Sequence, residues 1–429
     1  MKRVVTASFV GTTIEWYDFF LYGTAAALVF NQLFFPNFSD LAGTLAAFGA
    51  FAAGFVVRPL GGVVFGHFGD RVGRKSMLVL SLLIMGLATF ALGLLPTYAS
   101  AGIIAPVLLV ILRLLQGFAV GGEWGGAVLM AVEHSPAHRR GFNGSWPQAG
   151  SPAGLLLATA AFAAVSALPQ EQFLAWGWRI PFLLSALLVI VGLFVRLRLL
   201  ETPEFTQVKR SETRSRIPIL DAVRNHPKNM ALAFGACVAP FLNFYLFAVF
   251  VLTYATSELG IPRGTALLAV AIAAGIETFT IPAFAALSDR LGRRAVFLTG
   301  TVALALFAFP FFWVIGLGSP VVFAVATIFG LAVIHPMMYG PLAALFTEMF
   351  SARVRYSGAS LGYQIGGILG GGFAPLILTS LLAATGGPWA IPPYIIAAAL
   401  VTFVAVYLAT KAKTQSGSST PTAVKMSHS

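Results

Sequence analysis

Charged residues are scarce in this sequence of 429 residues, and their scarcity decides the class of protein. Asp, Glu, Lys and Arg make up 10% of the chain, whereas 58% of its residues are hydrophobic. The mean hydropathy is +0.86. A soluble domain of this length needs far more charge on its surface. The composition therefore excludes a soluble globular protein and predicts an integral membrane protein.

Cysteine and histidine are also rare. The single cysteine, Cys237, lies in an apolar stretch, so an internal disulfide is impossible. None of the six histidines has metal-ligand spacing on an apolar stretch, and no nucleophile is accompanied by a base. We therefore expect neither enzyme activity nor a bound cofactor.

Acidic residues are fewer than basic ones, with 15 Asp and Glu against 27 Lys and Arg. In a soluble protein the resulting charge of +12 would suggest nucleic acid as a partner. In a membrane protein, Lys and Arg instead collect in cytoplasmic loops. The expected partner is therefore the lipid bilayer and not nucleic acid.

Apolar stretches long enough to cross about 30 Å of hydrocarbon, roughly 20 residues each, dominate the chain. We count twelve of them, at 6–31, 42–65, 76–96, 103–130, 142–168, 177–197, 229–257, 264–287, 295–317, 319–345, 357–384 and 389–410. The sequence predicts an all-α membrane protein with twelve transmembrane helices.

The basic residues fit this count. All except four of them fall on one side of a twelve-span arrangement, which places both termini in the cytoplasm. The exceptions are Arg179 and Arg263 at the outer face and Arg58 and Arg113 inside spans. The polar stretch 201–228, of mixed charge and with three prolines, is the expected linker between six-helix halves. Their predicted bounds are 1–200 and 229–410, followed by a disordered cytoplasmic tail at 411–429.

A short loop occurs twice. GHFGDRVGRK at 66–75 is echoed by SDRLGRR at 288–294, half a chain later, which indicates an internal duplication. Its glycines permit a tight turn, and its acid can sit at a neighbouring helix N-terminus. A basic loop between membrane helices is common, but recurrence at matching positions argues for a role. We expect gating residues here, namely Asp70, Arg71, Arg74, Asp289 and Arg293.

Ionisable residues inside spans are expensive, so each one is a functional candidate. On the first span Glu15 and Asp18 share a face with Tyr22, and two carboxylates that repel when ionised can hold a proton. The alternative is that they are solvated near the membrane surface. Arg58 needs an anion, either one of these two carboxylates or a substrate carboxylate gripped in bidentate fashion.

The fourth span carries Arg113, Gln116 and Glu123 among glycines that allow close helix packing. An arginine and a glutamate buried in one helix suit proton coupling, and the alternative is a fixed buried ion pair.

The second half offers fewer ionisable groups. Glu277 is alone in its span and is a candidate for proton coupling; it is either such an active-site group or the partner in an interhelical bond. His335 beside a proline is more often a packing or hydrogen-bonding residue than a proton relay. In the first half, Pro147 is expected to break the hydrogen-bond ladder of the fifth helix near the pocket. The neutral hydrogen-bonding candidates for substrate, from both halves, are Tyr22, Gln148, Asn243, Tyr245, Tyr363 and Gln364.

Five runs carry a family resemblance: IEWYDFFLYG, RPLGGVVFGHFGDRVGRK, RLLQGFAVGGEWGGA, WGWRIPF and EMFSARVRYSGAS. Together they resemble the metabolite:proton symporter family of the major facilitators, over roughly residues 6–410. That family includes carriers of shikimate, dicarboxylates and citrate, and also of proline and betaine. The resemblance implies a monomer of two pseudo-symmetric halves in a bacterial inner membrane, with a central pocket and uptake driven by the proton gradient.

Our hypothesis from the sequence is a proton symporter for a small organic anion. Arg58 would bind the substrate carboxylate while Glu15, Asp18 or Glu123 takes the proton, with Arg113 as electrostatic partner. The alternative is uptake of a zwitterionic osmolyte. The short tail without a heptad pattern argues against it, because long charged tails go with the osmotic sensors of the family.

Overall fold

A computed structural model describes residues 2–72, 74–121, 128, 131–132, 135–198, 224, 227–350 and 355–416. All regular secondary structure in these residues is helical. By length and composition, nine of the described helices are able to cross a membrane, and two shorter apolar helices cover Val79–Leu94 and Ile104–Val120. Together with the first helix, they account for the twelve predicted spans.

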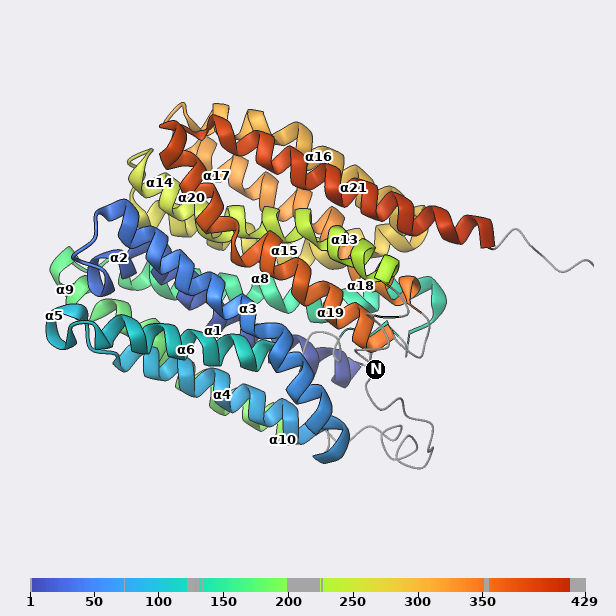
Figure 1. The fold of residues 1–429 in the computed structure, drawn as a ribbon, viewed down its shortest axis with the longest axis horizontal. Helices are drawn as coiled ribbons and strands as arrows, with labels where there is room; N and C mark the ends of the chain where they lie inside the picture. The colour runs from blue at the N-terminus through green and yellow to red at the C-terminus, as the bar shows by residue number, and fades with distance from the viewer. Residues whose placement is uncertain are drawn as a thin grey trace, which may run out of the picture.

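Six spans precede the predicted linker. They are α1 (Lys2–Leu28), α3 (Asp40–Val72), α4 (Arg74–Leu94), α6 (Ile104–Val120), α8 (Arg140–Val165) and α10 (Ile180–Arg198). The short helices α2 (Phe30–Phe34), α5 (Tyr98–Ala101) and α9 (Gln170–Ala175) connect them at the end of the bundle remote from the N-terminus (Figure 1).

Six further spans follow the linker. Three contain a π-helical turn: α13 (Pro227–Tyr245) with η3 (Leu246–Phe250) and α14 (Val251–Ser257), α17 (Pro320–Phe329) with η4 (Gly330–Ile334) and α18 (His335–Met349), and α19 (Arg355–Gly367) with η5 (Ile368–Gly372) and α20 (Ala374–Thr385). The others are α15 (Arg263–Leu291), α16 (Arg293–Ile315) and α21 (Ile391–Ser416).

The two sets of helices form two bundles that lie side by side. In Figure 1 the blue-to-green helices α1 to α10 form one bundle and the yellow-to-red helices α13 to α21 form the other. Helices α8 and α15 pack against each other where the bundles meet. The start of α1 and the end of α21 lie at the same end of the molecule.

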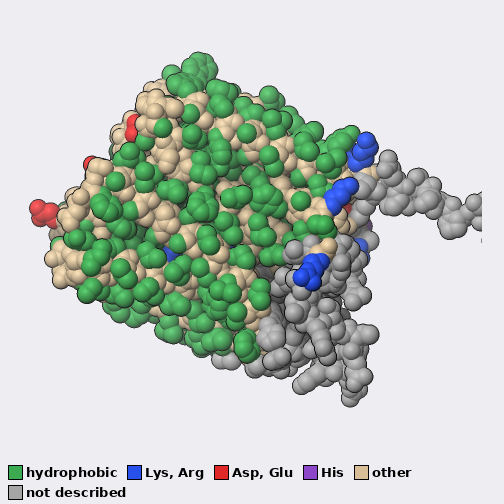
Figure 2. Space-filling model, in the orientation of Figure 1, with side chains coloured by type: hydrophobic (Ala, Val, Ile, Leu, Met, Phe, Trp, Pro, Cys, Tyr) green, Lys and Arg blue, Asp and Glu red, His purple; other side chains and the backbone are tan. Residues whose placement is uncertain are grey.

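The surface has the pattern of a protein embedded in lipid. Large apolar side chains are exposed on the outside of the helices, among them Leu306 at 72%, Phe279 at 71% and Val321 at 71%. Figure 2 shows apolar side chains over the visible face, with Lys and Arg gathered at one end. An apolar belt of this extent is stable only against hydrocarbon. The chain is a multi-pass membrane protein.

Prolines do not break α8. The helix runs continuously through Pro147 and Pro152, so the break in the hydrogen-bond ladder predicted at Pro147 does not end it. A proline removes only one intrahelical hydrogen bond, and neighbouring helices stabilise the rest of the ladder. Here α8 is packed between α1 and α15.

Candidate functional site

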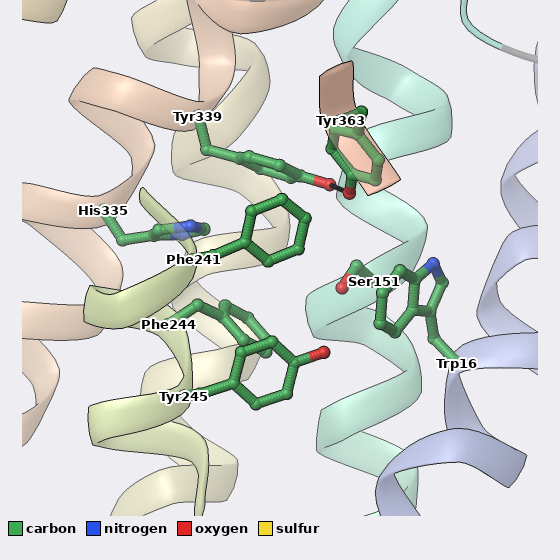
Figure 3. A pocket seen from close by; sticks show the side chains of 8 residues that line it. All are labelled: Trp16, Ser151, Phe241, Phe244, Tyr245, His335, Tyr339 and Tyr363. Carbon is green, nitrogen blue, oxygen red and sulfur yellow. Dashed lines mark hydrogen bonds between the residues drawn. The ribbon is translucent and has the colours of Figure 1, made fainter. Parts of the chain in front are cut away.

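A small pocket lies where the two bundles meet. Trp16 of α1 and Ser151 of α8 line one side. The other side consists of Phe241, Phe244, Tyr245, His335, Tyr339 and Tyr363. In Figure 3 the Tyr245 hydroxyl points across the pocket towards Ser151 and Trp16. The free space is about 10 Å³, which is room for about one water molecule. The aromatic walls are therefore closed on each other.

Arg58 is buried beside this pocket. Its guanidinium carbon lies 4.1 Å from the ring centre of Phe19 and 3.9 Å from that of Phe55, and the hydroxyls of Tyr245 and Tyr363 are within electrostatic reach. Its Nε and Nη2 atoms make no hydrogen bond. Among the described residues, no carboxylate pairs with Arg58, so a static ion pair with Glu15 or Asp18 is not formed.

Arg113 shares the ring of Phe19 with Arg58. Its guanidinium carbon is 3.7 Å from the centre of that ring and 4.6 Å from the ring of Tyr22. Nη1 donates to Gln116 Oε1 at 3.1 Å, which confirms that the two residues share a helix face. Nε and Nη2 have no partner. Within the described part of the chain, two buried guanidinium groups thus lie close together without a counter-ion, an arrangement that favours binding of an anion.

Asp18 is buried in the same bundle. Its Oδ1 accepts a hydrogen bond from Ser185 Oγ at 2.5 Å, and Oδ2 has no partner. The hydroxyl of Thr89 is next to the carboxyl group and accepts a bond of 2.8 Å from Gln116 Nε2. Because Gln116 also binds Arg113, a chain of polar groups connects the acid with the arginine.

Glu15 is 5% exposed and Asp18 fully buried, so the interpretation of these residues as solvated surface groups is wrong. In the second half, Glu277 is buried and its Oε1 is hydrogen-bonded to Nδ1 of His335. Glu123 lies outside the described residues.

The neutral candidates are divided between the pocket and the helix contacts around it. Tyr245 and Tyr363 line the pocket, and the Tyr363 hydroxyl is 2.8 Å from that of Tyr339. Three amide side chains donate to backbone carbonyls of other helices: Gln148 to Tyr339 at 2.9 Å, Asn243 to Gly330 at 3.2 Å and Gln364 to Gly121 at 3.0 Å. Each of these amides keeps a buried oxygen without a partner. The hydroxyl of Tyr22 is buried and has no partner either.

The second copy of the repeated loop connects the two bundles. Asp289 accepts backbone N–H bonds from Gly141 and Phe142, both 2.9 Å long, at the start of α8. Arg293 Nη2 is 3.3 Å from Asp289, and Arg293 also pairs with Glu348. The acid therefore caps a helix of the other bundle, where the dipole favours negative charge. In the first copy, the side chains of Asp70, Arg71 and Arg74 lie outside the described residues.

Sequence reasoning missed several contacts of these groups. Ser185 and Thr89 had no signal of their own, because hydroxyl residues are common in membrane helices. The clustering of aromatic residues around Asp18, in EWYDFFLYG, was a usable signal for ring contacts with the arginines.

Known proteins match the chain along its whole length. The sequence model of the protein family described as Major Facilitator Superfamily matches residues 8–371 and 232–426 of this chain. The shikimate transporter of Escherichia coli is 44% identical over 95% of this chain and 94% of its own. The inner membrane metabolite transport protein YhjE of Escherichia coli is 41% identical over 97% and 95%. The Escherichia coli proline/betaine transporter is 36% identical over 90% of this chain but 77% of its own length.

The fold has counterparts among solved structures. A D-xylose-proton symporter superposes with a TM-score of 0.74 at 18% identity, covering 94% of this chain and 97% of its own. At this identity the likeness concerns the fold.

Proposed function

This chain belongs to the major facilitator superfamily, and from that premise we propose that it is a proton-coupled symporter importing a small organic anion by alternating access. The observation that carries the proposal is the pair Arg58 and Arg113, which share the ring of Phe19 without a described carboxylate as partner. The similarity to a shikimate transporter favours a hydroxylated cyclic acid as substrate.

Arg58 binds the substrate carboxylate. Its unbonded Nε and Nη2 atoms can donate two parallel hydrogen bonds, the geometry that suits a carboxylate. Tyr245 and Tyr363 supply hydroxyl groups for the other oxygen atoms of the substrate. Further polar groups that can bind the substrate come from Tyr22, Gln148, Asn243 and Gln364.

The driving proton binds to Asp18, with Glu15 and the undescribed Glu123 as the remaining candidates of this half. Asp18 is fully buried and has an unbonded Oδ2 that can hold the proton. The hydrogen bonds of Thr89 and Gln116 connect this carboxyl group with Arg113, so a change in the protonation of Asp18 alters the surroundings of Arg113. When Asp18 is neutral, the positive charge of Arg113 is not offset from that side and attracts the substrate anion.

Transport requires the two halves to separate at one end at a time. The pocket in this structure is far smaller than the several hundred Å³ of a typical ligand site, so the walls must part to admit substrate. At the end where α1 starts, Asp289 must release α8. At the other end, the guanidinium carbon of Arg263 in the second half lies 3.7 Å from the ring centre of Phe173 in the first half. This contact must break when that end opens.

We place the protein in a bacterial inner membrane as a monomer, with both termini cytoplasmic and the proton gradient as its energy source. Residues 1–200 and 229–410 act as the two moving halves, joined by 201–228. The gathering of Lys and Arg at the end of the molecule where α1 begins supports this orientation (Figure 2).

An osmolyte carrier is the second candidate, because the chain is similar to proline/betaine transporters. A betaine brings a quaternary ammonium group, which needs a carboxylate or an open aromatic face. Arg58 lies over the ring of Trp16, a residue of the pocket wall, and its positive charge repels such a group. The geometry therefore favours the anion.

A ligand screen on the purified protein tests this assignment. Thermal stabilisation is measured with shikimate, dicarboxylates, aromatic acids, betaine and proline at acid and neutral pH. Stabilisation by an organic anion that grows as the pH falls supports the proposal, since a ligand that binds the folded state raises its stability. Stabilisation by betaine or proline alone contradicts it.

A further inference from the structure

The second six-helix half contains a buried acid and base pair at the pocket wall. The proton-coupling scheme above, which relies on Asp18, does not use this pair. Glu277 lies on α15 and His335 is the first residue of α18. Both are buried, at 0% and 2% exposure, and Glu277 Oε1 is hydrogen-bonded to His335 Nδ1. Glu277 Oε2 is buried without a partner. His335 is also a lining residue of the pocket (Figure 3), so the pair connects the buried Glu277 with the pocket.

The π-helical turn η4 sets the position of His335. Two backbone carbonyls of this turn accept side-chain hydrogen bonds from neighbouring helices. Asn243 Nδ2 donates to Gly330 at 3.2 Å, and Thr280 Oγ1 donates to Ala332 at 2.7 Å. Thr280 lies one turn after Glu277 on α15, so the same helix supports the turn and supplies the acid. Such π-turns occur preferentially at functional sites.

The groups facing the pair are aromatic and neutral. The ring of Tyr339 stacks on His335 at 4.9 Å, and the ring of Phe244 lies 5.1 Å away. The Tyr339 hydroxyl continues to Tyr363 at 2.8 Å, and Tyr245 faces the same space from α13. Helix α8 contributes Ser151 and Gln148.

Charged residues on the packed helices lie at the helix ends. They are Lys228 on α13, Glu258 after α14, Arg263, Asp289 and Arg290 on α15, Arg293 and Arg294 on α16, Glu348 on α18, Arg355 on α19, and His138, Arg139 and Arg140 at the start of α8. Those on α15 itself are about 20 Å from Glu277 along the helix. Within the described residues, each member of the pair therefore has the other as its nearest charged group.

We propose that Glu277 and His335 together form a proton-binding site in the wall of the substrate pocket, in addition to Asp18. The inference rests on the proposed symport function. With one proton the pair is neutral overall, either as carboxylic acid and imidazole or as carboxylate and imidazolium. Without that proton a negative charge remains on Glu277 beside the pocket. An incoming carboxylate is repelled by that charge, so binding of the anion and binding of the proton favour each other.

This arrangement gives each half one proton-binding site. In the first half, Asp18 is connected with Arg113 through Thr89 and Gln116. The Glu277 and His335 pair contacts the pocket directly through the imidazole ring in the second half. Movement of the second half against the first therefore depends on a protonation state located within it.

A titration of the substrate-free purified protein tests the proton site without any ligand. Infrared difference spectra are recorded as the pH is lowered, following the carbonyl band of protonated carboxyl groups. We expect a titrating band in the wild type that is absent in Glu277→Gln and present in Asp18→Asn. The matched control is Glu258→Gln, which removes an exposed acid of the same half. In His335→Gln the band remains but titrates at a different pH, because its proton-sharing partner is gone.

A titration that is the same in wild type and Glu277→Gln contradicts the proposal and leaves a fixed interhelical hydrogen bond. If Glu277→Gln does not fold, His335→Gln decides, and an unchanged titration there contradicts the proposal equally. A second measurement counts the protons taken up when shikimate binds in weakly buffered solution. We expect a lower number in Glu277→Gln than in the wild type, and an equal number contradicts the link to substrate. Failure of the wild type to bind shikimate would contradict the substrate assignment, while the substrate-free titration still decides the proton site.

Discussion

Arg58 and Arg113, from different helices, both lie over the ring of Phe19, with guanidinium carbons 4.1 and 3.7 Å from its centre. Like charges at such short range repel, and the aromatic face offsets only part of this cost. An anion placed near both arginines relieves the repulsion. Among the described residues no carboxylate pairs with either arginine, so the two cations around this ring favour a substrate that brings a negative charge.

Replacing Arg58 by Gln should raise the half-saturation constant for the transported anion. Loss of hydrogen bonds to a charged group costs about 1.5–3 kcal/mol, which corresponds to roughly ten- to a hundredfold in affinity. Uptake kinetics in proteoliposomes measure the change. The control is Arg290→Gln, an exposed arginine at the end of α15. Kinetics of Arg58→Gln equal to those of the control would remove Arg58 from the binding site.

Replacing Asp18 by Asn should uncouple transport from the proton gradient. The variant keeps the shape of the side chain but cannot lose or gain a proton, so it mimics the neutral acid. We expect accumulation against a gradient to be lost, while exchange of labelled for unlabelled substrate continues. Proton-driven accumulation at the wild-type level would show that another group carries the proton.

Asp289→Asn should slow turnover without weakening substrate binding. The bonds from Gly141 and Phe142 are charge-assisted, and loss of a cap of this kind costs about 1 kcal/mol. The form that is closed at that end of the molecule becomes less populated. Because each transport cycle must pass through this closed form, turnover slows. Equilibrium binding and initial uptake rate are compared in the same preparation. A parallel loss of binding would indicate a role in the pocket instead.

Gly117→Ala should destabilise the first bundle. An added Cβ would lie 2.9 Å from the Cα of Gly54, because the backbones of α3 and α6 touch at this point. Overpacking of this kind costs about 1–3 kcal/mol and would also displace Arg113 one turn away. The matched control is Gly49→Ala on α3, where an added Cβ meets nothing within 4 Å. Equal melting temperatures of the two variants would contradict the close approach.

The sequence predicts the fold more completely than the site. Twelve apolar stretches and the distribution of Lys and Arg are properties of composition, and lipid enforces them along the entire chain. The cost of burying a charge also identifies Arg58, Arg113, Asp18 and Glu277 without knowledge of the fold.

The partners of these groups could not be predicted in the same way. His335, the partner of Glu277, directly follows the π-turn η4, and the carbonyls of that turn accept side-chain bonds from Asn243 and Thr280 on other helices. No local pattern encodes that combination. The continuity of α8 through Pro147 likewise depends on the neighbouring helices and not on the proline itself.

Proton-coupled symport is tested most directly by uptake of labelled shikimate into proteoliposomes under an imposed pH gradient, acid outside. We expect accumulation that collapses when a protonophore is added and that is absent in Asp18→Asn. Uptake that proceeds equally without a gradient, or that survives the protonophore, would contradict proton-coupled symport.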